Sequence, residues 1–242
     1  MRTIMDPDNE VQYVCQICGY NMVGYLPDQC PFCGSPNQKF LTAEENSARR
    51  HVIGTRVNNK VTRLNSIPHL GYEHAAYRID TGTASLMIDC PSTFDRSLPR
   101  IGSILFTHHH FLGACNQYRA LYPAEVAIHG GDAGHDICRG FTFDTLFGGS
   151  FTRDGLSAMY LGGHTPGFTC YCYHDVLFIC DYVIRESGAM VINPYGPEEE
   201  TRFGLAALFD HLRGHPVSVV CGVDYVMNYP SWDKKVRPLL RR

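Results

Sequence analysis

Short hydrophobic runs, separated by turn residues, dominate the chain from Val57 onward. Many of these runs are rich in β-branched and aromatic side chains, which is the pattern of strands. Two of the runs are separated only by His174-Asp175, which predicts a tight hairpin. The runs that we expect to form strands are Val61–Ile67, Ala75–Asp80, Ser85–Asp89, Ile101–Thr107, Glu125–His129, Ser157–Leu161, Thr169–Tyr173, Val176–Cys180 and Val217–Cys221.

A helical period appears in two segments. Glu198 to Arg213 follows Pro197, ends before Gly214 and carries apolar side chains at helical spacing. Gly113 to Tyr122 predicts a shorter helix, which Pro123 would stop.

Composition divides the chain into three parts. Residues 1–41 contain two closely spaced cysteine pairs, residues 42–55 are polar without a sustained apolar period, and residues 56–242 carry the strand and helix signals. We therefore expect a small metal-binding domain, a linker or short helix, and a larger domain.

Composition and charge exclude several classes of partner. A hydrophobic content of 44% suffices for a core, and the net charge of −3 gives no basic footprint for nucleic acid. No apolar run reaches about 18 residues, so we expect no membrane partner. The segment Met1–Glu10 is polar, unlike a secretory signal. Because the eleven cysteines are an odd number, we expect reduced thiols and a cytoplasmic protein.

The cysteines fall into two groups. Cys15, Cys18, Cys30 and Cys33 form two Cys-x-x-Cys pairs, whose thiolates can close tetrahedrally on one ion. A unit of this size cannot fold on a core alone, and metal binding supplies about 10–16 kcal/mol in zinc-finger peptides. Two disulfides would fit neither the compartment nor the spacing. Three cysteines in apolar runs read as small core residues: Cys170, Cys172 and Cys180.

The first motif resembles the rubredoxin-like module of rubrerythrins. The resemblance rests on Cys-x-x-Cys-Gly-Tyr, Cys-Pro-x-Cys-Gly and Phe40, within residues 11–41. It implies one iron held by four cysteines and a role in electron transfer. Zinc stays open as the alternative metal, because four tetrahedral sulfurs suit both ions.

A second set of possible ligands follows the strand signals of the larger domain. His108 and His110 come after the apolar run Ile101–Phe106 and should point the same way, with His109 pointing away. His164 follows another run, and Asp181 ends the run Val176–Cys180. Three imidazoles and one carboxylate can hold a single zinc, iron or manganese ion.

Four stretches of the larger domain resemble the metallo-β-lactamase superfamily. They are Ile88-Asp89, Thr107-His108-x-His110, Gly163-His164-Thr165-Pro166-Gly167 and Leu177-Phe178-Ile179-Cys180-Asp181. The resemblance implies an α+β fold, an αββα sandwich preceded by the small rubredoxin-like knuckle, with metal at one edge of the sandwich.

Departures from the family pattern predict one metal ion in this domain instead of two. Leu112 and Gly113 occupy positions where the family has Asp and His, and Val223 occupies the position of the last family histidine. Another residue could still supply a ligand at the second metal position. Asp224 is either such a ligand or a solvated turn residue. Three cysteines are either ligands or small core residues: Cys90, Cys115 and Cys221.

The remaining candidate residues have auxiliary roles. We expect Asp89 to orient a ligand, and Asp181 either to complete the coordination or to hold the reacting water. His109 is either a packing residue or a proton shuttle. Other histidines, His74 and His135 among them, read as surface or structural residues.

Three functions fit these residues. The first is a metal-dependent hydrolase of a small-molecule substrate, because a metal held by three histidines lowers the pKa of bound water to about 7, and hydrolysis is the chemistry most of the superfamily performs. The alternative is an iron-dependent oxidoreductase that receives electrons through the rubredoxin-like domain. The third is a degenerate, non-catalytic binding module. A redox partner and a homo-oligomer are open as partners.

Overall fold

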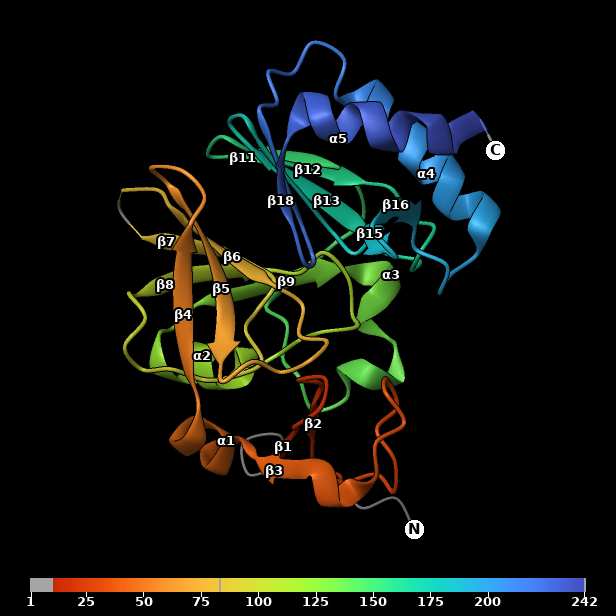
Figure 1. Cartoon of the computed structure of the whole chain (residues 1–242). Helices are drawn as coiled ribbons and strands as arrows, with labels where there is room; N and C mark the ends of the chain where they lie inside the picture. Colours follow the sequence, from red (N-terminus) through yellow and green to blue (C-terminus); the bar gives the residue numbers. More distant parts are fainter. Residues whose placement is uncertain (1–10, 83, 242) are drawn as a thin grey trace. The chain divides into compact units, whose positions relative to one another are not determined.

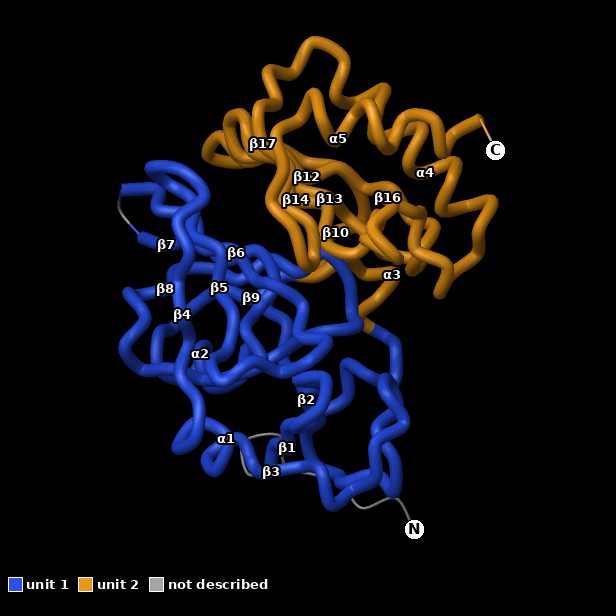
Figure 2. Tube along the Cα trace, viewed as in Figure 1, with its two compact units in different colours: residues 1–127, 134–145 blue, residues 128–133, 146–242 orange. Residues whose placement is uncertain are grey.

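The computed structural model describes residues 11–82 and 84–241, so our reading of Met1–Glu10 lies outside the described residues. The chain folds into two compact units (Figure 2). Unit 1 comprises residues 1–127 and 134–145, and unit 2 comprises residues 128–133 and 146–242.

A small antiparallel sheet in the order β2-β1-β3 begins unit 1. Its strands are β1 (Gln12–Cys15), β2 (Asn21–Val23) and β3 (Phe40–Thr42), with the 3-10 helix η2 (Asn37–Lys39) before β3. Thr42 also caps helix α1 (Ala43–Arg49), because its hydroxyl accepts from the Glu45 N–H while the Glu45 carboxylate accepts from the Thr42 N–H.

The segment predicted as a linker or short helix contains a short helix followed by a strand. It forms α1 and then strand β4 (His51–Arg56), which pairs antiparallel with β5 along its whole length. β4 is the edge strand of its sheet, and Val52 is its only buried residue. An exposed edge strand needs no alternating apolar pattern, which explains why the sequence gives no strand signal here. The domain boundaries themselves stay a prediction.

A seven-stranded sheet in the order β10-β9-β8-β7-β6-β5-β4 provides the strands of unit 1 from β4 to β8 (Figure 1). β7, β8 and β9 are parallel, so the residues that follow β7 and β8 emerge at the same sheet edge. The strands are β5 (Val61–Ile67), β6 (Ala76–Asp80), β7 (Ser85–Ile88), β8 (Ile101–Leu105), β9 (Glu125–His129) and β10 (Thr145–Phe147). Helix α2 (Cys115–Leu121) and the 3-10 helix η3 (Asp136–Cys138) belong to unit 1, and helix α3 (Gly130–Ala133) belongs to unit 2.

A second sheet, in the order β11-β12-β13-β14-β17-β18, organises unit 2. Its strands are β11 (Phe151–Arg153), β12 (Leu156–Tyr160), β13 (Thr169–Tyr173), β14 (Val176–Cys180), β17 (Val219–Gly222) and β18 (Val226–Asn228). A separate hairpin consists of β15 (Val183–Glu186) and β16 (Ala189–Ile192). The helices are α4 (Glu198–His211), α5 (Tyr229–Val236) and the 3-10 helix η4 (Arg237–Arg241).

Each strand expected after Val57 is present, and so are both expected helices. The predicted hairpin joins β13 to β14, with Tyr173 paired to Val176 and His174 at a positive φ of 52°. Among the described residues, no helix is both long and apolar enough to span a membrane.

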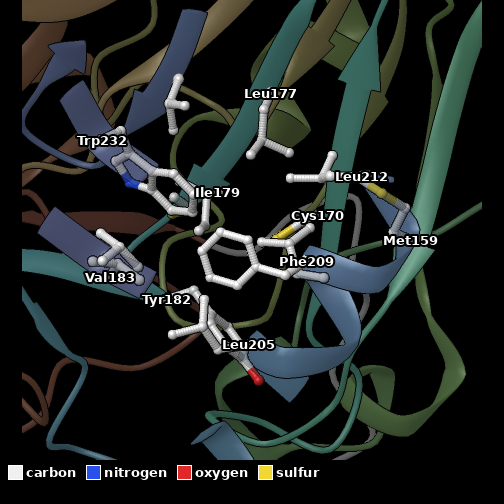
Figure 3. Packing of buried hydrophobic residues seen from close by; sticks show 14 of the residues in the cluster. Met159, Cys170, Leu177, Ile179, Tyr182, Val183, Leu205, Phe209, Leu212 and Trp232 are labelled. Atoms are coloured by element: carbon white, nitrogen blue, oxygen red, sulfur yellow. The ribbon is translucent and has the colours of Figure 1, made fainter. Parts of the chain in front are cut away.

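The hydrophobic core of unit 2 lies between its sheet and helices α4 and α5 (Figure 3). Leu205 and Phe209 of α4 meet Ile179 of β14 and Trp232 of α5 there. The Trp232 indole N–H donates to the Tyr225 hydroxyl, 3.1 Å away, so the buried indole is satisfied. Cys170, Cys172 and Cys180 belong to this core, as expected for small apolar residues.

Helix α4 offers a test of this packing with a matched control. Leu205 is fully buried, whereas Phe203 on the same helix is 77% exposed. Leu205→Ala should lower the free energy of unfolding by about 2–5 kcal/mol through lost burial and a residual cavity. Phe203→Ala should change it by less than about 0.5 kcal/mol. Chemical denaturation measures both, and equal effects would contradict this description of the core.

Candidate metal centres

Two turns with the same backbone hydrogen bond position the four cysteines of the two Cys-x-x-Cys pairs. The Cys15 carbonyl accepts from the Gly19 N–H and the Cys30 carbonyl accepts from the Gly34 N–H, each at 2.9 Å. Gly19 and Gly34 have φ values of +83° and +70°, which glycine adopts without steric cost. The glycine after each Cys-x-x-Cys pair is therefore required by the turn.

The four cysteine sulfurs lie at ligand spacing. Sγ of Cys15 is 3.7 Å from Sγ of Cys33, Sγ of Cys18 is 3.6 Å from Sγ of Cys30, and all four lie within 4.8 Å of one another. Sulfurs bound at about 2.3 Å to one tetrahedral ion lie about 3.8 Å apart. A disulfide needs about 2.05 Å, and all four thiols are free. The donor set and its spacing fit one tetrahedral ion.

Proximity couples the ionisation of these thiols. Hydrogen bonds from the neighbouring thiols, that of Cys18 first, lower the pKa of Cys15, and its proximity raises the pKa of Cys30 to about 11. Cys15 also raises the pKa of Cys18. The Ser35 hydroxyl lies 3.2 Å from the sulfurs of both Cys15 and Cys33. The thiolate of Cys15 thus suppresses ionisation of Cys18 and Cys30, which a bound cation would reverse.

The end of β8 positions His108 through a chain of hydrogen bonds. Asp89, which follows β7, accepts from the Thr107 N–H at 2.8 Å and from the Thr107 hydroxyl at 2.9 Å. That hydroxyl lies 3.0 Å from Nδ1 of His108. Because its single proton goes to Asp89, the hydroxyl accepts from a protonated Nδ1, which leaves the lone pair of His108 on Nε2. Asp89 therefore orients a candidate ligand, through Thr107.

His110 lies beside His108 and His109 does not. The rings of His108 and His110 are 4.7 Å apart, and each offers a ligand nitrogen within 4.8 Å of the other. His109 is buried, its ring is 6.3 Å from that of His108, and it stacks on His135 at 4.0 Å. His109 has the packing contact that the sequence allowed; the proton-shuttle role stays a prediction.

In unit 2, His164 and Asp181 come together. Both side chains are buried, and Nε2 of His164 lies 3.4 Å from Oδ2 of Asp181. Two ligands bound at about 2.0–2.1 Å to one tetrahedral ion lie about 3.4 Å apart. The side-chain amide of Asn193 donates to the Asp181 backbone carbonyl at 2.9 Å and to Oδ2 of Asp181 at 3.2 Å, which fixes the carboxylate.

Asp132 of α3 shapes the loop that carries His164. Its fully buried carboxylate accepts from the Thr165 hydroxyl and from the Gly167 N–H, each at 2.8 Å. Asp132 and Asn193 are functional residues that sequence reasoning missed. Asp132 is 33 and 35 residues from its partners along the chain, and Asn193 is 12 residues from Asp181. Neither residue belongs to a local motif, so only their polarity within apolar surroundings could have indicated them.

Backbone strain occurs at one strand end in unit 1 and at one in unit 2, each beside candidate ligands. Asp89 has a φ of +55° and Cys180, directly before Asp181, has a φ of +47°. Such conformations in non-glycine residues cost about 1–3 kcal/mol and persist where the surroundings hold them, often at functional sites. Asp154, His174 and Ser187 have positive φ as well but lie outside this set of ligands, so only Asp89 and Cys180 connect backbone strain with the candidate site groups.

Among the described residues, the groups of donors at ligand spacing contain none of the residues considered for the second metal position. Leu112 is buried, and at Gly113, with a φ of +55°, an added Cβ would lie 2.4 Å from the carbonyl oxygens of Cys90 and Pro91. Asp224 is exposed and faces Arg185 at 3.7 Å. Cys90, Cys115 and Cys221 are buried, and burial raises the pKa of both Cys90 and Cys115. These features fit a single ion at the histidines.

A family model matches the N-terminal part of the chain. Residues 13–41 match the rubrerythrin, rubredoxin-like domain family. No curated protein sequence matches this chain.

Solved structures resemble the chain over most of its length. A metallo-beta-lactamase from Pontibacter korlensis aligns with a TM-score of 0.63 and 16% identity, over 79% of this chain and 100% of that chain. A metallo-beta-lactamase superfamily protein from Sulfolobus tokodaii aligns with a TM-score of 0.52 and 16% identity, over 69% of this chain and 79% of that chain. A metallo-beta-lactamase from Erythrobacter litoralis aligns with a TM-score of 0.53 and 12% identity, over 81% of this chain and 96% of that chain. The chain has the metallo-β-lactamase fold preceded by a rubredoxin-like module, which confirms the predicted fold class.

The hydrogen-bond chain to His108 can be tested by removing one hydroxyl. Thr107→Val should weaken metal binding at the histidines about 10–100-fold, because the imidazole loses the group that fixes its tautomer and orientation. Thr145→Val, which removes an exposed hydroxyl bonded to Glu125, is the matched control and should bind metal normally. Chelator competition measures the affinity, and an unchanged value for Thr107→Val would refute this role.

Proposed function

We propose that the chain is an iron-dependent oxidoreductase acting on a small-molecule oxidant. One iron is held by Cys15, Cys18, Cys30 and Cys33, and a second by His108, His110, His164 and Asp181. The main support for this proposal is that Phe111, the residue after His110, packs in the same hydrophobic cluster as three of the four cysteines.

Ligand number supports a shared ion at the histidines. Each unit offers two donors at ligand spacing: His108 and His110 in unit 1, and His164 and Asp181 in unit 2. Two donors alone leave an ion poorly coordinated, whereas three imidazoles and one carboxylate complete a four-ligand set. Solved structures of the same fold align over up to 81% of the chain, so both units belong to that fold.

Iron at such sites supplies one-electron chemistry with the cysteines and, with the histidines, an open position for oxygen or another small oxidant. The protein contributes a short path between the two sets of ligands. Phe32 lies between Cys30 and Cys33 in sequence, and its ring is 4.6 Å from that of Phe111. The Phe111 ring stacks on His74 at 3.8 Å, and His74 is 6.1 Å from His108. Aromatic contacts therefore run from the cysteine turn to the candidate ligand.

Two further residues have proposed roles in the reaction. Asp181 completes the ligand set or holds the reacting water, and Asn193 keeps its carboxylate in one orientation. His109 is the candidate proton carrier, because its ring lies 4.7 Å from that of His110 and against the exposed His135.

Apolar exposure at the cysteines supports an external redox partner. Ile17 is 38% exposed and Phe32 is 44% exposed, and both occupy variable positions of the Cys-x-x-Cys pairs. A partner docking there would approach the cysteines closely. A reducing compartment such as the cytoplasm fits the eleven free thiols. Assembly into a homo-oligomer stays open.

A metal-dependent hydrolase is the second candidate function. Its support is the name metallo-beta-lactamase carried by the similar structures, together with a histidine whose lone pair on Nε2 suits zinc. The cysteines would then hold a structural zinc ion. A degenerate binding module has less support, because buried donors at ligand spacing persist in both units.

Reoxidation kinetics separate the two enzymatic functions. The protein, purified without oxygen and loaded with iron, is reduced and mixed with dissolved oxygen while the absorbance of the cysteine-bound iron is followed. We expect rapid reoxidation in the wild type. His164→Ala should lose the iron at the histidines and the rapid phase while the cysteine-bound iron stays.

The exposed His211→Ala is the control and should behave like the wild type. Two results contradict the proposal: a colourless protein that takes up zinc alone at both sites, or a His164→Ala variant that reoxidises at the wild-type rate. The first would favour the hydrolase.

A further inference from the structure

The loop that carries His108 and His110 is held at both of its ends within unit 1. At its start, Thr107 is bonded to Asp89. At its end, Phe111 is buried among Cys15, Cys18 and Cys30. The Gly113 carbonyl accepts from the side-chain amide of Gln12 in β1, at 3.0 Å. The second set of contacts belongs to the cysteine module.

The cysteine module is in turn docked on the larger part of unit 1. The Gly71 N–H donates to the carbonyl of Ile17 at 2.7 Å, and the Asn21 amide donates to the carbonyl of Ser92 at 3.2 Å. Gly19 approaches Ser92 so closely that an added Cβ would lie 2.5 Å from the Ser92 hydroxyl oxygen. Gln12 donates to Asn21 as well, at 2.7 Å. These contacts involve the backbone of the first cysteine turn itself.

Metal binding and the order of this module are linked. A module of about thirty residues has too small a core to fold alone, so the metal supplies much of its folding free energy. Without the ion, the first cysteine turn loosens and Phe111 and Gln12 lose their fixed surroundings. His108 and His110 are then held at one end only. Ligands that are less well oriented bind metal more weakly.

We infer that the two metal centres are energetically coupled: metal in the cysteine site strengthens metal binding at the histidines, and Phe111 and Gln12 transmit the effect. The inference rests on the proposed ion at the histidines, but it holds for either reaction. Because a coupling free energy is reciprocal, metal at the histidines also strengthens retention of the cysteine-bound ion.

Phe111→Leu and Gln12→Ala test this coupling without touching a candidate ligand. Zinc is the probe, and competition with a chromophoric chelator gives the dissociation constant of the ion that His164→Ala removes. Both variants should keep the cysteine-bound ion but raise the dissociation constant at the histidines about 10–100-fold. Phe141→Leu, at a buried phenylalanine of the same unit, should leave it unchanged.

A double-mutant cycle separates coupling from local loosening. Cys30→Ser combined with Cys33→Ser should weaken the histidine site by a similar factor. Adding Phe111→Leu to that pair should weaken it little further, since Phe111 acts through the occupied cysteine site. The coupling is refuted if the effects of Phe111→Leu and of the two cysteine substitutions on the affinity of the histidine site are fully additive. It is also refuted if Phe111→Leu binds metal there with wild-type affinity. Neither result contradicts the proposed function. Absence of any ion that His164→Ala removes overturns the proposed function as well.

Discussion

The spacing of buried donor atoms constrains the rest of this structure. Four sulfurs lie 3.6 to 3.7 Å apart in their closest pairs, and ionising one thiol raises the pKa of Cys30. In unit 2, an imidazole nitrogen and a carboxylate oxygen stand 3.4 Å apart, wider than a good hydrogen bond and right for two ligands of one ion. The turns, the strained strand ends and the buried Asp132 all hold these donors in place. We therefore propose that the fold is a scaffold for two metal centres.

Elements and ligands that depend on a local sequence pattern could be predicted from the sequence. Strands such as Val176–Cys180 are continuous apolar runs between turn residues, and α4 has a clear helical period between Pro197 and Gly214. The four cysteines are diagnostic because their spacing alone brings two pairs to one ion. The exposed edge strand β4 lacked such a pattern. Helix α5 was not predicted either. Asn228 caps it and Pro230 stands in its first turn, but its eight residues are too few to show a clear helical period in the sequence.

Contacts between distant parts of the chain could not be predicted. Gln12 and Gly113 are 101 residues apart, and nothing near Gln12 indicates that it holds the histidine loop. Phe111 reads as an ordinary core residue, although it packs among the cysteines. Asn193 orients Asp181 from a loop without any motif. Tertiary packing decides each of these, and a single sequence does not contain it.

The packing of Phe111 changes how the two motifs are understood. Taken from the sequence, the cysteine module is a separate attachment to a hydrolase fold, and hydrolysis has no use for an electron-transfer centre. Within unit 1, the module shares its hydrophobic cluster with the residue next to His110, and aromatic rings continue from there to His108. That arrangement favours redox chemistry. It also makes the module a support for the ligand loop, whatever the reaction.

Anomalous X-ray diffraction at the metal absorption edge, from crystals of the metal-loaded protein, tests the account most directly. The account predicts two peaks per chain, one among the four cysteine sulfurs and one bound by His108, His110, His164 and Asp181. A third peak, or a second peak that lacks either His164 or the pair His108 and His110, would contradict it.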